Sequence, residues 1–280
     1  MIGGIEFGGT KCILAVANNP LEIIEKKIIP TRDPENTFLD IVSFFGKFKI
    51  DNLGIGVFGP IILDKELADF GLLVTESKKG WKGVNIVTNL SERLGVNILI
   101  DTDVNAAAIG EYYYGAGQLA KSMVYVTVGT GIGVGVLSNG KPHIGNFHLE
   151  VGHMQIPNLD QFHGICRFHS DCWEGLASGP SIEARWGQPG DKLPKSHEAW
   201  EKEAELLADG LINIISNHSP DKIILGGGVM NQKHLYPLIR SKVKKMWNDY
   251  TPLGSLADLI LEPGLGNDSG IIGSLSLERN

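Results

Sequence analysis

Short apolar runs alternate with glycine-rich turns from the first residues of the chain. Two apolar runs flank Glu6-Phe7-Gly8-Gly9-Thr10-Lys11, and a third extends from Leu21 to Ile29. This pattern predicts a three-stranded antiparallel meander whose first turn is rich in glycine. The turn is either a plain hairpin connection or a place where backbone approaches a ligand.

Helical and strand patterns then follow one another. Apolar residues in helical spacing predict a helix from Pro34 to Phe45, and the run from Leu53 to Phe58 predicts a buried strand. A helix over Asn85 to Leu94 and a strand over Val96 to Ile100 come next. The irregular segment from Ile61 to Gly83, which precedes this helix, contains Trp81. This residue is either a loop anchor or a residue beside a ligand.

The segment Asp101-Thr102-Asp103-Val104-Asn105 joins the predicted strand to the helix that follows it. In open α/β sheets, ligands bind beyond the carboxyl ends of the strands. A carboxylate at this place is also a common helix N-cap. Both roles are therefore open for Asp103.

A second strand–turn–strand unit begins at Met123 and reads VTVGTGIGVG at residues 126–135. A dinucleotide-binding turn would have to open a helix. Here the next apolar run leads into Asn139-Gly140, a strong hairpin signal. The unit repeats the logic of the N-terminal turn. It indicates a duplicated architecture in which backbone N–H groups of two turns hold a phosphate chain.

The remaining pattern predicts three helices and a strand. They are a helix from Trp200 to near Pro220, a strand from Lys222 to Leu225 that runs into Gly226-Gly227-Gly228, a helix from Asn231 to Trp247 and a closing helix from Asn267 to Leu277.

Composition narrows the classes of function. The 280 residues carry a net charge of −7, which argues against a nucleic-acid partner. No apolar run approaches the ~20 residues that span a membrane, and the start of the chain lacks the pattern of an export signal. Three cysteines do not form a disulfide framework. A cytoplasmic location is therefore expected.

The stretch from Leu149 to Glu174 concentrates metal-ligand side chains. Cys166, His169 and Cys172 form a C-x2-H-x2-C cluster. Either His153 or His163 supplies a fourth ligand, although a chance accumulation in a surface loop would look the same. Thiolates and imidazoles at this spacing suit a tetrahedral structural zinc ion. We expect His143, His148 and His163 to lie at the surface or to support other residues. The thiol of Cys12 is expected in the apolar core.

In their order, EFGGTK (6–11), DTDVNAAAIGE (101–111), VTVGTGIGVG (126–135), EVGH with the Cys/His loop (150–174) and LGGGVM (225–230) resemble the ROK family of bacterial sugar kinases, and most of all its fructokinase branch. The resemblance implies an α/β fold of the actin/hexokinase ATPase type, with two ribonuclease-H-like lobes and an interlobe cleft. It implies an N-terminal lobe over residues 1–115, a C-terminal lobe with the zinc loop over 116–266, and a C-terminal helix over 267–280 that packs on the first lobe.

The resemblance also assigns roles to residues. Asp103 is the general base, ATP comes with Mg²⁺, Glu6 is a partner of that ion through water, and zinc is held by His153, Cys166, His169 and Cys172. His153 would use one ring nitrogen for zinc and the other for the sugar. The ATP-binding residues are Gly8, Gly9, Thr10, Lys11, Thr130, Gly131, Gly133, Gly179, Gly227 and Gly228. The sugar-binding residues are Thr102, Asp103, Glu150, His153 and Glu174.

Departures from the family's glucokinases favour fructose over glucose. Thr102 stands where they typically have Asn, Glu6 stands where many members have Asp, and the metal loop has fewer cysteines. The expected reaction is the ATP-dependent conversion of D-fructose to fructose 6-phosphate by a homodimer. The alternatives are a kinase for mannose, glucose or N-acetylmannosamine, a non-catalytic sugar-sensing ROK protein, and an actin-type ATPase scaffold.

Overall fold

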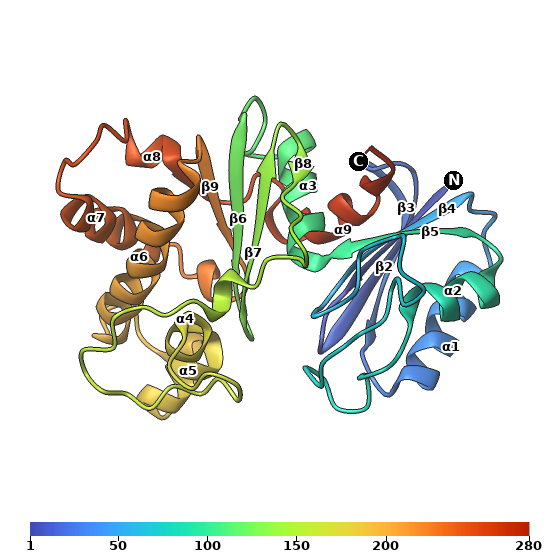
Figure 1. The fold of residues 1–280 in the computed structure, drawn as a ribbon, viewed down its shortest axis with the longest axis horizontal. Helices are drawn as coiled ribbons and strands as arrows, with labels where there is room; N and C mark the ends of the chain where they lie inside the picture. The colour runs from blue at the N-terminus through green and yellow to red at the C-terminus, as the bar shows by residue number, and fades with distance from the viewer. Residues whose placement is uncertain (280) are drawn as a thin grey trace. The chain divides into compact units, whose positions relative to one another are not determined.

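The structure, a computed structural model, describes residues 1–279 and divides into two compact units (Figure 1). The first unit contains residues 1–115, 140–149 and the segment that starts at Asp268. The second contains residues 116–139 and 150–267. The predicted C-terminal segment 267–280 includes Asn280, which lies outside the described residues. The chain therefore leaves and re-enters each unit.

The first unit is built on a five-stranded sheet in the order β3-β2-β1-β4-β5. Its strands are β1 (Ile2–Phe7), β2 (Lys11–Asn19), β3 (Glu22–Pro30), β4 (Asn52–Val57) and β5 (Asn97–Thr102). β1, β2 and β3 pair antiparallel, whereas β1 pairs with β4 and β4 with β5 in parallel. The predicted meander is confirmed. The parallel strands place their carboxyl ends at one edge of the sheet.

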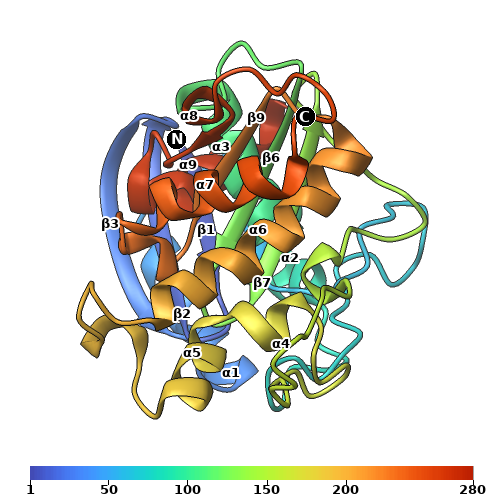
Figure 2. The ribbon, with the colours of Figure 1, turned by 90° about the vertical axis from the view of Figure 1, so that its left-hand side faces the viewer.

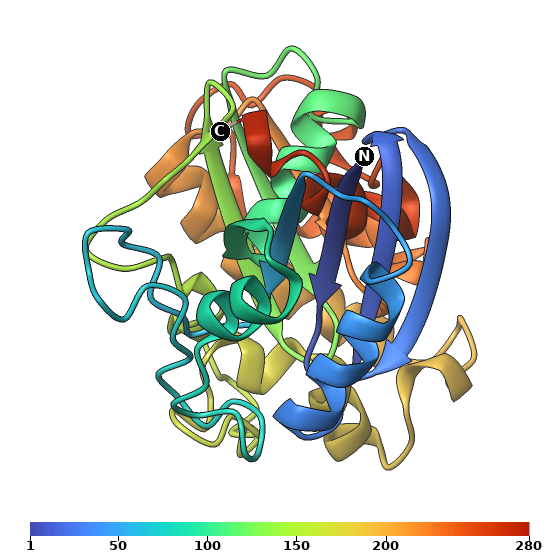
Figure 3. The same cartoon turned by 90° about the vertical axis from the view of Figure 1, so that its right-hand side faces the viewer.

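Helices cover both faces of this sheet. Because strand side chains alternate between faces, Ile5 and Phe7 join a buried apolar cluster with α1 (Pro34–Phe45) and α2 (Ile86–Leu94), which Figure 3 shows in front of the sheet. The opposite face receives α3 (Asp103–Tyr114) and α9 (Ser269–Ser274). The β4 residues Gly54 and Gly56 leave room for these two helices, since a Cβ on either would overlap Ser274 or Ala106.

Trp81 is a structural anchor of the first unit. Its side chain is fully buried and meets the rings of Phe7, Phe38 and Phe58 edge-on at centroid distances of 5.2–5.8 Å. Its indole N–H donates to the carbonyl of Arg32 at 2.9 Å. A ring so enclosed cannot meet a ligand, so the loop-anchor interpretation is correct.

The second unit has a five-stranded sheet in the order β10-β9-β6-β7-β8. Four of its strands lie in the second unit, namely β6 (Ser122–Val128), β7 (Ile132–Ser138), β9 (Lys222–Gly226) and β10 (Ile260–Leu261). The edge strand β8 (Lys141–Pro142) lies in residues 140–149, which belong to the first unit. β6 and β7 pair antiparallel, and β6 and β9 pair in parallel. Read from β8, the order of strands repeats that of the first sheet. This repetition confirms the predicted duplicated architecture.

The helices of the second unit are α4 (Trp173–Ala177), α5 (Gly179–Trp186), α6 (Ala199–His218), α7 (Leu235–Trp247) and α8 (Leu256–Leu259). α6 and α7 lie side by side in front of the sheet in Figure 2. Within residues 1–279, no helix combines the length and apolarity needed to cross a bilayer.

Two predicted helices are shorter in the structure. The helix expected from Asn231 begins at Leu235, because residues 229–231 form a separate 3-10 turn after the glycine cluster. The helix expected over residues 267–277 is regular only from Ser269 to Ser274, with 3-10 turns on both sides. Both differences lie at helix ends, where glycines and weak caps leave the boundary undetermined by periodicity.

Candidate active site

Asp103 is the first residue of α3 and directly follows β5. The N-cap is Thr102, whose hydroxyl accepts from the Asn105 N–H at 3.2 Å. The Asp103 carboxylate instead accepts from the Val104 N–H at 2.9 Å. The N-cap interpretation of Asp103 is therefore wrong, because the preceding threonine occupies the cap.

A buried brace supports this first turn of α3. Oδ1 of Asp101 accepts from the Thr102 N–H and from the Asn105 side-chain amide, both at 2.7 Å. Asn105 is thus tied to the strand end by its side chain and to the Thr102 hydroxyl by its backbone. Two of the orphan N–H groups at the helix start are satisfied in this way. The backbone that carries Asp103 is held on both sides.

Burial makes three carboxyl groups near the ends of β1 and β5 weakly acidic. It raises the pKa of Asp103 to about 6 and that of Asp101 to about 6. It also raises the pKa of Glu6, at the end of β1, to about 7, with the negative charge of Asp103 adding to the effect and Lys11 opposing it. A carboxylate with a pKa near 6 is ionised at neutral pH and is still basic enough to accept a proton.

The first glycine turn connects β1 to β2. The Gly8 N–H donates to the carbonyl of Lys11 at 3.0 Å, and the hydroxyl of Thr31 donates to the carbonyl of Gly8 at 2.7 Å. Gly9, Thr10 and Lys11 are exposed, and no atom lies within 4 Å of a Cβ placed on Gly9. The turn is fixed at its base and open at its tip.

The second glycine turn lies between β6 and β7 and consists of Gly129, Thr130 and Gly131. The Gly129 N–H donates to the carbonyl of Gly131 at 2.9 Å, and the carbonyl of Gly129 accepts from the Gly179 N–H at 2.8 Å. Gly133 lies within β7, opposite Thr127 of β6. The turn is thus attached to the start of α5.

The glycines that follow β9 come to the same edge of the second sheet, since β9 is the parallel neighbour of β6. Gly227 has a φ of +90° and lies so close to Val128 that a Cβ would overlap its backbone. Gly228 is exposed, with open space beside it. The structure therefore brings together Gly179, Gly227 and the turn at residues 129–131, all from one unit.

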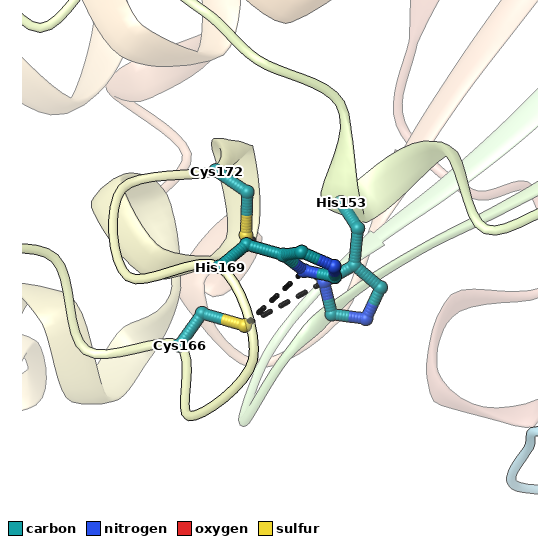
Figure 4. A group of neighbouring side chains, drawn as sticks. All are labelled: His153, Cys166, His169 and Cys172. Atoms are coloured by element: carbon teal, nitrogen blue, oxygen red, sulfur yellow. Dashed lines mark hydrogen bonds between the residues drawn. The ribbon is translucent and has the colours of Figure 1, made fainter.

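The predicted metal ligands form a compact group in the second unit (Figure 4). One ligand atom from each of His153, Cys166, His169 and Cys172 lies within 4.8 Å of the others. His163 does not belong to this group among the described residues. Sγ of Cys166 lies 3.7 Å from Nδ1 of His153 and 3.8 Å from Nδ1 of His169, and Sγ of Cys172 lies 3.5 Å from Nδ1 of His153.

These separations fit a tetrahedral ion. Ligands at about 2.3 Å for sulfur and about 2.0 Å for nitrogen, at tetrahedral angles, are about 3.5 Å from one another. Burial raises the pKa of the Cys172 thiol to about 12, so its thiolate form requires the charge of a cation. The donor set of two sulfurs and two imidazoles is one that zinc binds with four protein ligands.

The ring of His153 has two distinct sides. Nδ1 faces the sulfurs, whereas Nε2 lies 3.9 Å from a carboxylate oxygen of Glu150. Both residues come from the segment around the 3-10 turn Val151–His153. When Nδ1 binds a metal, Nε2 carries the proton and can donate to a nearby oxygen. One ring can serve both the metal and a ligand.

Glu174 lies in the first turn of α4, two residues after Cys172. Its Oε2 accepts from the Ile132 N–H at 3.0 Å, at the end of the second glycine turn. Trp173 beside it is fully buried and donates from its indole N–H to the carbonyl of Leu206 at 3.0 Å. Glu174 thus stands between the metal loop and the glycine turn.

His148 is a buried residue that the sequence interpretation placed at the surface or in a supporting role. Only 8% of it is exposed, and its Nε2 accepts from the Ile61 N–H at 3.1 Å. Burial lowers its pKa. It fixes the chain two residues before Glu150. Nothing in the local sequence distinguishes it from the exposed histidines, because its partner is 87 residues away.

A model of the ROK family matches residues 2–280. The chain belongs to the ROK family. A protein of Bacillus subtilis (strain 168) described as a putative fructokinase is 40% identical to this ROK protein over 283 residues, which cover 99% of this chain and 95% of the relative. A fructokinase of Pediococcus pentosaceus is 37% identical, with 100% of this chain and 98% of the relative aligned.

Solved structures of ROK proteins share the fold of this chain. A ROK glucokinase of Streptomyces griseus, solved with glucose and AMPPNP, has a TM-score of 0.81 at 22% identity and covers 100% of this chain and 99% of its own. A ROK hexokinase of Thermus thermophilus has a TM-score of 0.79 at 22% identity, with 99% and 97% covered. The predicted α/β fold of the actin/hexokinase type is confirmed.

Within this ROK protein the predicted site residues fall in both units. Thr102, Asp103 and the turn Gly8–Lys11 belong to the first unit, whereas Glu150, His153, Glu174 and the turn at residues 129–131 belong to the second. The four predicted metal ligands are brought together. The contacts of these residues with ATP and with a sugar stay predictions.

Proposed function

We propose that this ROK protein phosphorylates a hexose with ATP and that D-fructose is its substrate, converted to fructose 6-phosphate. The observation that carries the proposal is the set of five relatives named fructokinase or putative fructokinase, 36–40% identical over 90–100% of this chain. Relatives named glucokinase are 24–26% identical. The difference in identity favours fructose over glucose.

The general base is Asp103. In phosphoryl transfer the protein mainly positions the reactants and stabilises charge. The 6-hydroxyl oxygen of the sugar forms a bond to the γ-phosphorus, the bond from that phosphorus to the β–γ bridging oxygen breaks, and ADP leaves. The hydroxyl proton passes to the carboxylate of Asp103. The brace of Asp101, Thr102 and Asn105 supports this role because it fixes the start of α3.

Backbone N–H groups bind the nucleotide. The tips of both glycine turns are exposed and present little side chain, as phosphate-binding turns require. The residues proposed for ATP are Gly8, Gly9, Thr10, Lys11, Thr130, Gly131, Gly133, Gly179, Gly227 and Gly228. Mg²⁺ would accompany ATP and neutralise phosphate charge, and the half-buried carboxylate of Glu6 would interact with it through water.

Zinc is structural in this proposal, and His153, Cys166, His169 and Cys172 hold it. It fixes the loop that presents Glu150, His153 and Glu174 to the hydroxyls of the sugar. Thr102 and Asp103 are the sugar-binding residues of the first unit. Residues 1–115 are the lobe of the general base, and residues 116–266 are the lobe of the zinc loop. The active protein is a homodimer, which sedimentation of the purified protein tests.

A panel of sugars tests the function. Purified protein with Mg²⁺ and ATP is given fructose, mannose, glucose and N-acetylmannosamine in an assay that couples ADP release to NADH oxidation. The expected result is the highest kcat/KM with fructose, and the Asp103→Asn variant is the control for contaminating kinases. If kcat/KM is higher for another sugar, that sugar and not fructose is the substrate. If no sugar of the panel causes ADP release, the proposal is overturned.

A further inference from the structure

We infer that Glu174 couples hexose binding to nucleotide binding through the second glycine turn. This inference rests on the proposed function, in which Glu174 meets the sugar and the turn at residues 129–131 meets the phosphates of ATP. The inference assigns Glu174 a further role, which is to position the glycine turn, in addition to its proposed contact with the sugar. All the contacts involved lie within the second unit.

The first observation is the contact between Glu174 and the turn. Oε2 of Glu174 accepts from the Ile132 N–H at 3.0 Å. Gly131 packs directly against the carboxylate, since a Cβ at this position would overlap Oε2 and would lie 3.2 Å from Cδ. A Cβ at residue 131 would therefore have to displace the carboxylate of Glu174, which is the end of a flexible side chain. The turn adopts its shape against this side chain.

A second attachment joins the same two segments. The Gly179 N–H, at the start of α5, donates to the carbonyl of Gly129 at 2.8 Å. Glu174 lies in the first turn of the short helix α4 and Gly179 begins α5, so one segment holds the turn at both of its ends. The hydroxyl of Ser181 donates to the carbonyl of Glu174 at 3.1 Å and further ties α4 to α5. A displacement of this segment moves the whole turn.

The backbone of Glu174 has little freedom of its own. Trp173 is fully buried against α6, where a Cβ on Gly210 would overlap its ring. Cys172, on the other side of Trp173, belongs to the metal group. The side chain of Glu174 is consequently the movable part between a fixed loop and the turn.

The chemistry of a carboxylate allows it to serve both ligands. Its two oxygens offer about four acceptor positions, of which the Ile132 N–H takes one. A sugar hydroxyl that donates to the remaining positions selects one rotamer of Glu174. The turn is then ordered before ATP arrives, so the cost of ordering is shared between the two ligands. Thermodynamic linkage requires that each ligand tightens the other by the same factor.

Titration calorimetry with the full chain in its zinc form tests the coupling. AMPPNP with Mg²⁺ is titrated with and without saturating fructose, and fructose is titrated with and without AMPPNP. In the wild type each ligand is expected to lower the Kd of the other by about 5-fold or more. Gly131→Ala displaces the carboxylate, so fructose should bind more weakly and the factor should fall to about 1.

Gly129→Ala is the matched control in the same turn. The nearest atom to a Cβ there is the backbone nitrogen of Gly228 at 3.8 Å, so Glu174 is undisturbed and the factor should be that of the wild type. Glu174→Ala should also reduce the factor to about 1. Glu174→Gln keeps an acceptor for the Ile132 N–H and should retain part of it. Zinc content and circular dichroism establish that each variant is folded.

The outcomes separate the inference from the proposed function. If the wild type binds both ligands with a factor of 1, the inference fails and the kinase assignment stands. Full coupling in a folded Gly131→Ala or Glu174→Ala protein also overturns the inference. If no sugar of the panel is phosphorylated, the proposed function fails and the inference fails with it.

Discussion

Nδ1 of His153 lies 3.5 Å from the sulfur of Cys172. The imidazole therefore approaches the metal group with one nitrogen and turns the other away from it. The sequence leaves open whether this histidine can serve a metal and a sugar together. The geometry permits both, because Nδ1 lies beside the sulfurs and Nε2 lies 3.9 Å from a carboxylate oxygen of Glu150.

Removal of a metal ligand should weaken sugar binding. In Cys166→Ser or Cys172→Ser the zinc content, measured by elemental mass spectrometry, should fall well below one ion per chain. The KM for fructose should rise by about tenfold or more, because even residues that only hydrogen-bond the metal ligands change metal affinity or activity by this factor when they are replaced. Cys12→Ser is the control, because Cys12 is buried in the other unit, and burial raises the pKa of its thiol to about 12. A zinc-free variant with the KM of the wild type would contradict a supporting role of the metal.

Replacement of the general base should affect turnover more than binding. Asp103→Asn should lower kcat by about 10²- to 10⁴-fold, the usual loss for a general base, and leave the Kd of fructose nearly unchanged. Asp101→Asn is a matched control two residues earlier. An asparagine oxygen there can still accept from Thr102 and Asn105, so a much smaller loss is expected. Equal losses in the two variants would argue against Asp103 as the base.

Activity should decrease in mild acid. Burial raises the pKa of Asp103 to about 6, and only the ionised carboxylate accepts a proton, so kcat/KM should fall by about tenfold for each pH unit below 6. Glu6 has a pKa of about 7 and still holds its proton when Asp103 ionises. Glu6→Gln should therefore leave the midpoint of this decrease in place. A pH–rate profile that is flat from pH 5 to 8 would exclude a base of this kind.

Variants of Thr102 separate a capping role from a sugar contact. Thr102→Val removes the N-cap hydroxyl and should lower the free energy of unfolding by about 1 kcal/mol, whereas Thr102→Ser should retain it. Thr102→Asn also caps a helix, so stability is kept. If Thr102 contacts the sugar, this variant should lower kcat/KM for fructose relative to kcat/KM for glucose. If the ratio of the two kcat/KM values is unchanged, Thr102 caps the helix and does not contact the sugar.

Local pattern was sufficient for most of the fold. The alternation around Gly8-Gly9 and Gly129–Gly131 predicted both strand–turn–strand units, because side-chain period and turn residues are local properties. Both ends of the helix Pro34–Phe45 were predicted correctly. Its start is marked in the sequence because Pro34 follows the capping residue Asp33. The helix expected from Asn231 lacks a capping side chain, and its start was misplaced by four residues.

The parts of the candidate site that escaped prediction depend on long-range contacts. The spacing of Cys166, His169 and Cys172 is visible in the sequence, and the structure brings His153 to them across 13 residues. The bonds from Ile132 to Glu174 and from Ile61 to His148 join residues 42 and 87 positions apart. Neither periodicity nor a sequence motif predicts such pairs. They can be identified only from the tertiary structure.

The C-terminal helix α9 belongs to the first unit, although it follows the second unit in the chain. The Gly56 N–H of β4 donates to the hydroxyl of Ser274 at 3.1 Å, and Gly4 of β1 packs against Leu275. During synthesis on the ribosome, the part of this sheet face that α9 covers consequently stays exposed until the whole second unit has emerged. The second unit can reach its folded form first. A deletion of α9 would therefore remove packing from α3, the helix that begins with Asp103, although the two helices lie far apart in the sequence.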